Sequence, residues 1–264
     1  MGHVLLDPYY QGSSLIHRLD ARLKVLGTLA FVLAATSTPP AAWPAFVLLA
    51  LLALTAIHLA GLPFGQVLKR SAVVLPFAGM VALSLPFHGV GRPLWSWQPF
   101  GLELSVTDEG LRLFVSVLAK SWLAVLVSGL LVATTTVPDL LAALRALRVP
   151  ALLTSTIAFM LRYLHVLVEE ATRMLTARQA RSAGSGRTIA WRARVLGGMI
   201  GSLFVRSYER SERIYAAMLA RGYAGPAGQA RSLQPLAWQT RDSWAALAWC
   251  LALAGIALLA YTIS

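Results

Sequence analysis

Long apolar runs alternate with short polar connections along most of this 264-residue chain. A membrane-spanning helix needs about 20 mostly apolar residues, with some tolerance in length. Five runs come close to that length: 23–38, 43–60, 72–87, 113–133 and 245–263. The pattern therefore predicts an all-α integral membrane protein with about five transmembrane helices.

The connections between the runs differ in charge, and the difference predicts an orientation. Cytoplasmic loops of membrane proteins collect Lys and Arg. The segment 138–243 contains fifteen arginines and six acids, and the connection 61–70 contains Lys69 and Arg70. The connection 88–111 contains one basic residue, Arg92, and two tryptophans. We expect the N-terminus and 138–243 in the cytoplasm, 88–111 outside, and the C-terminus outside.

This orientation divides the chain into three parts. Residues 1–137 form an N-terminal membrane region with four spans, 138–243 form a cytoplasmic region of coupling helices, and 244–264 form a C-terminal span. The stretch 151–168 is apolar enough to enter the membrane but contains Arg162 and His165. We interpret it as a helix that leaves the bilayer at a slant, and whether it crosses stays open. The first run is interpreted as a span, with a signal peptide as the alternative.

The composition supports a membrane protein. Hydrophobic residues make up 57% of the chain and charged residues 13%, whereas a soluble domain has about 25% charged residues. The net charge of +12 is explained by basic cytoplasmic segments rather than by nucleic-acid binding, since the basic residues lie between apolar runs. Cys250 is the only cysteine, which excludes an internal disulfide and a cysteine-rich zinc site.

Two long helices are predicted in 138–243, from about 151 to 182 and from about 203 to 221. Each ends with an alanine, an arginine and a small residue: Ala180, Arg181 and Ser182 in the first, and Ala220, Arg221 and Gly222 in the second. Arginine favours helix C-termini through the helix dipole, and Gly222 suits a C-cap, so a purely structural role is one explanation. The other is that each arginine binds carboxylates of a partner, because its planar guanidinium pairs with them bidentately.

Several motifs resemble those of one family. They lie at 17–25, 138–144, 148–150, 161–164 with Glu169 and Glu170, and most specifically at 209–223. On these residues, and over nearly its whole length, the chain resembles the transmembrane T component of energy-coupling-factor (ECF) transporters of the CbiQ cobalt/nickel type.

The resemblance implies a non-catalytic coupling subunit in the plasma membrane of a prokaryote. In this family, two Ala-Arg-Gly motifs end two coupling helices, and each docks into one of two ATP-binding cassette ATPase subunits. A separate substrate-binding membrane subunit is then reoriented. Ala220, Arg221 and Gly222 match the second motif fully. Ala180 and Arg181 match the first, with Ser182 where the motif has glycine, and Arg178 is the alternative to Arg181.

Other functional signatures are absent from the sequence. No Gly-x-x-x-x-Gly-Lys-Ser/Thr loop is present, so ATP hydrolysis is assigned to the partner subunits. The histidines, His3 included, lack metal-ligand spacing, and no cofactor or metal site is expected in this chain. The alternatives are a membrane enzyme, for which no acid or histidine cluster is seen, and a stand-alone secondary carrier. Lys120 is the only charge inside a span that favours a carrier. The cargo, cobalt, nickel or a vitamin, stays open, as do the ATPases.

Overall fold

The computed structural model describes residues 10, 12, 14–88, 93–97, 104–181, 188–223, 225 and 238–263. Its elements in chain order are α1 (Ala21–Ser37), α2 (Trp43–Ala60), α3 (Phe64–Ala72), α4 (Val74–Ala82), α5 (Leu85–His88), β1 (Pro93–Trp97), β2 (Leu104–Thr107), α6 (Asp108–Thr134), α7 (Val137–Ala146), α8 (Ala151–Arg181), α9 (Ile189–Ala220) and α10 (Thr240–Ile263). They form two compact units, Met1–Ala143 with Leu236–Ser264, and Leu144–Pro235. The three-part division at residues 137 and 243 stays a prediction.

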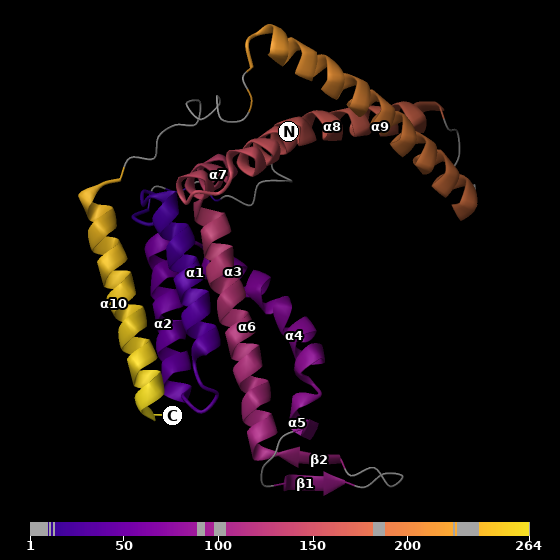
Figure 1. The fold of residues 1–264 in the computed structure, drawn as a ribbon. Helices are drawn as coiled ribbons and strands as arrows, with labels where there is room; N and C mark the ends of the chain where they lie inside the picture. The colour runs from indigo at the N-terminus through magenta and orange to yellow at the C-terminus, as the bar shows by residue number, and fades with distance from the viewer. Residues whose placement is uncertain are drawn as a thin grey trace. The chain divides into compact units, whose positions relative to one another are not determined.

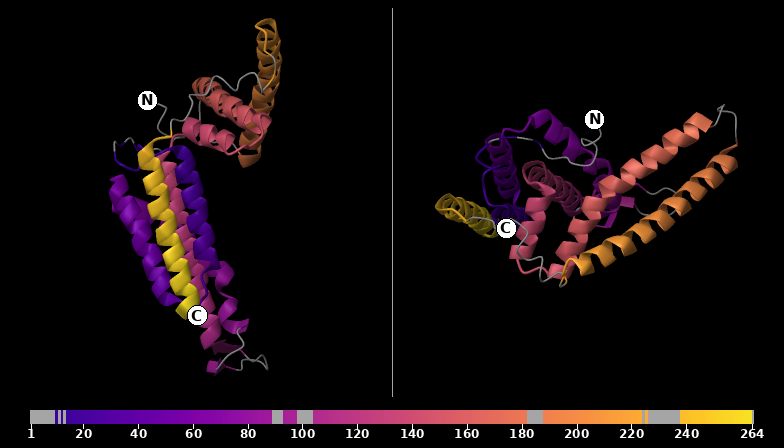
Figure 2. Two further views of the ribbon diagram at one scale, coloured as in Figure 1. Left: turned by 60° about the vertical axis from the view of Figure 1, so that its left-hand side comes forward. Right: turned by 90° about the horizontal axis from the view of Figure 1, so that it is seen from above.

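The first unit is a bundle in which α1, α2, α6 and α10 lie side by side (Figures 1 and 2). Its core combines large residues such as Phe31 of α1 and Leu126 of α6 with small residues of α2. Ala45, Ala53 and Ala60 are among the buried residues of α2. Small side chains let helix backbones approach closely, which is how membrane helices associate when hydrophobic burial alone does not drive them together.

The prediction of an all-α membrane protein is confirmed. Among the described residues, four helices are long and apolar enough to cross a membrane by length and composition: α2, α6, α8 and Thr240–Thr262 of α10. The first predicted span corresponds to α1, which has 17 residues. The third predicted span, 72–87, does not form one helix.

Prolines divide this third stretch. A proline inside a helix cannot donate to the carbonyl four residues earlier, and its ring clashes with that carbonyl. Pro76 stands four residues after Ala72, where α3 ends, and Pro86 stands four residues after Ala82, where α4 ends. The expectation of one continuous span over 72–87 was therefore wrong, because it counted apolar residues and gave no weight to the two prolines.

The connection before α6 contains regular structure that the sequence analysis did not predict. Strands β1 and β2 pair antiparallel, with Pro93 opposite Thr107 and Trp97 opposite Leu104. Helix α6 follows at once, and the Thr107 hydroxyl accepts from the Gly110 amide as an N-cap. A Cβ at Gly110 would stand 2.7 Å from the Leu85 carbonyl oxygen. The start of α6 thus packs against α5 at a distance that only glycine allows.

The second unit contains α8 and α9, which run antiparallel and cross each other (Figure 2). Helix α8 matches the predicted helix over 151–182. Helix α9 begins at Ile189, not near residue 203, so the predicted start was wrong. Gly197, Gly198 and Gly201 weaken the helical pattern there, each at a cost of about 1 kcal/mol relative to alanine. Trp191 and Val195, which precede the glycines, line a cavity shared with α8.

Candidate functional site

The first predicted motif lies at the end of α8. Ala180 and Arg181 are the last two residues of the helix, and both are exposed. Arg178, the alternative, lies one turn earlier with its guanidinium carbon 5.7 Å from the centre of the Trp191 ring. Ser182 lies outside the described residues. Arg181 therefore stands at a helix end with its side chain in solvent, while Arg178 stacks on the neighbouring helix.

The second motif ends α9 in a Schellman motif. Gly222 has a φ of +79° and donates its amide to the Leu219 carbonyl, and the Tyr223 amide donates to the Met218 carbonyl. This is the pattern in which a residue in the left-handed conformation stops a helix. Ala220 is the last helical residue and Arg221 is the C-cap, and both are exposed. Glycine at this position thus has a structural reason of its own, and it leaves Arg221 at the very end of the helix.

The two arginines lie at opposite ends of the helix pair. Arg181 and Trp191 line the same cavity, so the end of α8 lies beside the beginning of α9. Arg221 follows Trp191 by thirty residues along a helix, which at 1.5 Å per residue places it roughly 45 Å away. The two helix ends were predicted from the sequence but not this distance, because the second helix was predicted to begin near residue 203, which left a long connection that sets no direction of packing.

An ion pair connects the two helices between these ends. Glu170 of α8 accepts from Arg206 of α9 at 2.8 Å and from Arg173, one turn further along α8, at 2.9 Å. These hydrogen bonds, first from Arg173 and then from Arg206, hold the pKa of Glu170 below its ordinary value. The cross-helix partner Arg206 is thirty-six residues from Glu170 in the sequence.

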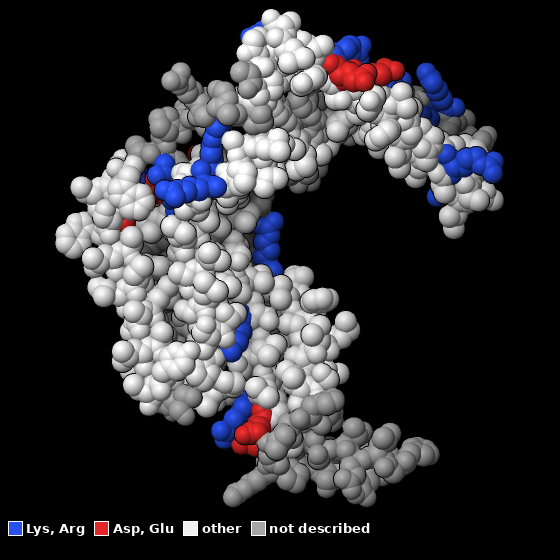
Figure 3. All heavy atoms as spheres, in the orientation of Figure 1, with Lys and Arg blue, Asp and Glu red and all other residues white. Residues whose placement is uncertain are grey.

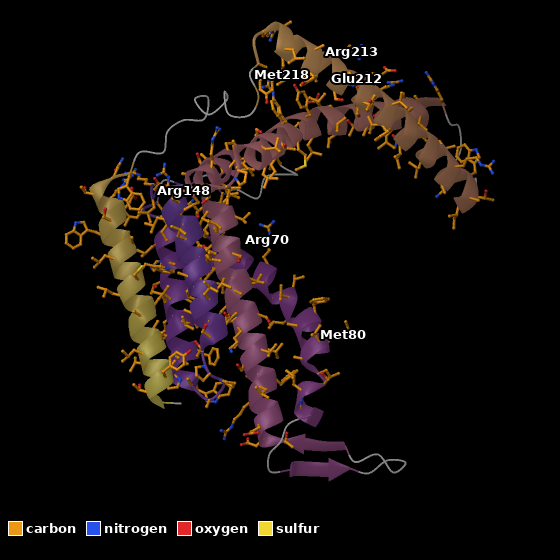
Figure 4. The ribbon with its side chains drawn as sticks, viewed as in Figure 1. Arg70, Met80, Arg148, Glu212, Arg213 and Met218 are labelled. Atoms are coloured by element: carbon orange, nitrogen blue, oxygen red, sulfur yellow. The ribbon has the colours of Figure 1, made fainter. Side chains whose placement is uncertain are left out.

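A second cavity, of about 350 Å³, lies near the end of α9. Tyr163 of α8 and Met218 and Tyr223 of α9 are among its lining residues. Figure 4 shows Met218 on the side of α9 that faces α8, whereas Glu212 and Arg213 point away from it. The last turn of α9 and its Schellman motif therefore lie across this cavity from α8.

A buried polar cluster in the first unit was missed by the sequence analysis. Asp242 at the start of α10 is 1% exposed, and its carboxylate accepts from the amides of Asp20 (3.3 Å) and Gln239 (2.9 Å). Lys24 of α1 donates to the carbonyl oxygens of His17 and of Thr134, the last residue of α6. The cluster connects the 17–25 motif to the end of α6 and to the start of α10. Asp20 and Asp242 are 222 positions apart, so no local sequence pattern predicts their contact.

Lys120, the charge inside a predicted span, also has a structural partner. Its ammonium donates to the carbonyl oxygen of Thr36 in the last turn of α1 at 3.0 Å. Carbonyl groups at a helix C-terminus lack helical partners and attract cations through the helix dipole. Lys120, the residue that favoured a secondary carrier, therefore caps the carboxyl end of α1.

The segment between α7 and α8 has an unusual backbone conformation. Arg148 has a φ of +67°, and it is the only non-glycine residue with positive φ among the described residues. Its amide donates to the Arg145 carbonyl and that of Val149 to the Leu144 carbonyl, again a Schellman pattern. Pro150 follows, just before α8 begins. The 148–150 motif therefore ends one helix and starts the next (Figure 4).

Comparisons with known proteins agree with the motifs and the helical architecture. A family model described as "Cobalt transport protein", CbiQ, matches residues 12–232. The chain belongs to the CbiQ family. It is 32% identical over 241 residues to the energy-coupling factor transporter transmembrane protein EcfT of Acidaminococcus fermentans, covering 86% of each chain. It is 28% identical over 272 residues to the protein of the same name from Lacticaseibacillus paracasei, covering 98% of this chain and 99% of that one.

The family and the relatives define a coarse function. The family model is described as a cobalt transport protein, and the relatives are named as transmembrane proteins of energy-coupling factor transporters. The resemblance seen in the motifs is confirmed. In the part of the chain that the structure describes, no group of three or more His, Cys, Asp or Glu residues could hold a metal ion.

Proposed function

We propose that this chain is the coupling (T) subunit of an ECF-type importer and that Arg181 and Arg221 dock two separate ATPase subunits. The observation that carries the proposal is the position of the two arginines. Both are exposed, both end a long helix, and they lie at opposite ends of one antiparallel pair. A spacing of roughly 45 Å along the helices leaves room for two partner molecules.

The proposal assigns each residue of the motifs a task. Arg181 and Arg221 bind acidic grooves of the ATPases, since a guanidinium keeps its charge and pairs bidentately with carboxylates. Ala180 and Ala220 are small and let the partner approach the helix end. Gly222 ends α9 at Arg221, and Ser182 takes the place of glycine after Arg181.

The pair of helices transmits the movement of the ATPases to a substrate-binding membrane subunit. The ion pair of Glu170 with Arg206 supports this proposal, because it connects α8 to α9 between the two ends. The proposed cargo is cobalt or nickel, in accord with the description of the family model. Metal selection is assigned to the substrate-binding subunit.

Co-purification from a prokaryotic membrane tests the docking. The Arg181→Glu, Arg221→Glu double variant is expected to lose both ATPases, which the wild type retains. Arg162→Glu with Arg213→Glu is the matched control, since it makes the same change in charge at exposed positions within the same two helices. Equal ATPase retention by the test and wild-type proteins would contradict the assignment of the two arginines. Equal loss of the ATPases from the double variant and from the control variant would show a general effect of charge. That result would also contradict the assignment of the two arginines.

A further inference from the structure

The end of the helix pair where α8 stops and α9 starts is strongly basic. Residues 171–181 and 188–205, here called the arginine end, contain five arginines and no aspartate or glutamate. The five are Arg173, Arg178, Arg181, Arg192 and Arg194. Acidic residues begin again at Glu209 and Glu212, further along α9. On the face drawn in Figure 3, basic side chains lie over the beginning of α9, and acidic ones over its later part.

A cavity of about 810 Å³ opens between the helices at this end. Four arginines line it, Arg173, Arg178, Arg181 and Arg206, together with apolar residues such as Met174 and Val195. Glu170 is the one acid among the lining residues, and it is bound to Arg173 and Arg206. The lining therefore carries an excess of positive charge beside an apolar wall.

The opposite face of α9 is apolar and exposed. Ile189, Ile200 and Phe204 are 85%, 67% and 70% exposed, and Leu196 is 40% exposed. Their spacings of seven, four and four residues place them on one face of the helix. Trp191, Val195 and Met199 form a different face, which lines the cavity with α8. The first half of α9 thus has an apolar face turned to its surroundings, with arginines on either side.

We propose that the arginine end docks on the surface of a bilayer that contains anionic phospholipid. The apolar face of α9 enters the boundary between headgroups and acyl chains, and the arginines bind lipid phosphates. A helix with apolar residues on one face and arginines on the other lies in the plane of a membrane interface, and clusters of four to eight basic residues select anionic lipid. An acidic protein surface would account for the arginines and the cavity. It would not account for the four exposed apolar residues on one face of α9.

This surface is distinct from the proposed ATPase contacts except at Arg181. Arg192, Arg194 and the apolar face of α9 have no task in the coupling proposal. The lipid contact would hold one end of the helix pair at the membrane while the ATPases move. Variants that leave Arg181 and Arg221 intact therefore test the lipid contact separately from the docking of the ATPases.

The experiment uses the full chain and its single cysteine. In a Cys250→Ser background, Ile200→Cys carries an NBD fluorophore, and the protein is placed in nanodiscs of phosphatidylcholine with or without phosphatidylglycerol. We expect a blue shift and a severalfold fall in quenching by a neutral aqueous quencher only when phosphatidylglycerol is present. The Arg192→Gln, Arg194→Gln variant, which leaves Arg178, Arg181 and Arg221 intact, is expected to lose this protection. A label at Ala216→Cys, exposed on the later part of α9, is the control and should not respond.

Several results would overturn the proposal. One is equal quenching in both lipids, and another is protection that persists in the arginine variant. Protection that appears only after a substrate-binding subunit or the ATPases are added would assign the face to a protein partner. Protection by inorganic phosphate in pure phosphatidylcholine would assign the arginines to a soluble anion. Circular dichroism of the arginine variant should show unchanged helicity, which excludes a loss of fold. Unchanged co-purification of the ATPases with that variant would show that only the lipid contact is lost.

Discussion

Lys24 and Lys120 each cap the helix on which the other lysine stands. Lys24 of α1 donates to the carbonyl oxygen of Thr134, where α6 ends, at 3.0 Å. Lys120 of α6 donates to the carbonyl oxygen of Thr36, in the last turn of α1, at 3.0 Å. The two helices run in opposite directions, so one ammonium group serves each carboxyl end. Both charges inside the apolar runs are thus used to join α1 to α6.

Replacing either lysine with methionine should destabilise the membrane bundle. Lys24→Met removes two hydrogen bonds from an ammonium group, to His17 and Thr134, and should cost about 1.5–3 kcal/mol. Lys120→Met removes one such bond at a more exposed position and should cost less. Thermal unfolding in detergent, followed by size-exclusion chromatography, measures the effect. Lys69→Met at the exposed end of α3 is the control, and a midpoint for Lys24→Met equal to that of the control would contradict the capping role.

Gly110 and Gly129 in α6 should respond differently to alanine. A Cβ at Gly110 would stand 2.7 Å from the Leu85 carbonyl and 2.8 Å from the Pro86 Cα, both backbone atoms that cannot easily move. Gly110→Ala should therefore cost about 1–3 kcal/mol through overpacking. No described atom lies within 4 Å of a Cβ at Gly129, so Gly129→Ala should be neutral or slightly stabilising. Equal thermal stability of the two variants would show that α6 does not start against α5 in this way.

The sequence predicted elements that depend on local composition and missed those that depend on packing. Helices α2, α6 and α10 follow from long apolar runs, and the end of α9 follows from Gly222. The start of α9 was missed because Gly197, Gly198 and Gly201 weaken the helical pattern over its first half. The contact of Asp20 with Asp242 was missed because it joins the two ends of the chain. Pro76 and Pro86 can be read from the sequence. Because a proline leaves the carbonyl four residues earlier without a helical donor, the two breaks could have been predicted after Ala72 and Ala82.

Gly222→Ala should loosen the end of α9 without unfolding the protein. The φ of +79° costs an L-residue with a Cβ about 1–2 kcal/mol. Hydrogen exchange should become faster at the amides of Gly222 and Tyr223, which close the Schellman motif. Gly222→Asn should have a smaller effect, since asparagine tolerates this conformation better. Unchanged exchange in the alanine variant would mean that the helix does not end in this motif.

Glu170 should titrate below the ordinary range of a glutamate. Hydrogen bonds from Arg173 and Arg206 lower its pKa, so its contribution to helix pairing is present above the unfolded pKa and is lost as pH falls through the folded one. Carbon-13 NMR of glutamate-labelled protein, with Glu170→Gln to assign the signal, measures the pKa. Arg206→Gln should raise it part of the way to its ordinary value, because Arg173 remains. A pKa unchanged by Arg206→Gln would contradict the cross-helix ion pair.

Native mass spectrometry of the complex with single-arginine variants tests the coupling account most directly. Arg181→Glu and Arg221→Glu should each leave one ATPase subunit bound per chain, because the two arginines lie at opposite ends of the α8–α9 pair. The wild type should retain two, and the double variant none. Retention of two ATPases by both single variants, or loss of both from each, would contradict the assignment of one docking end to each ATPase.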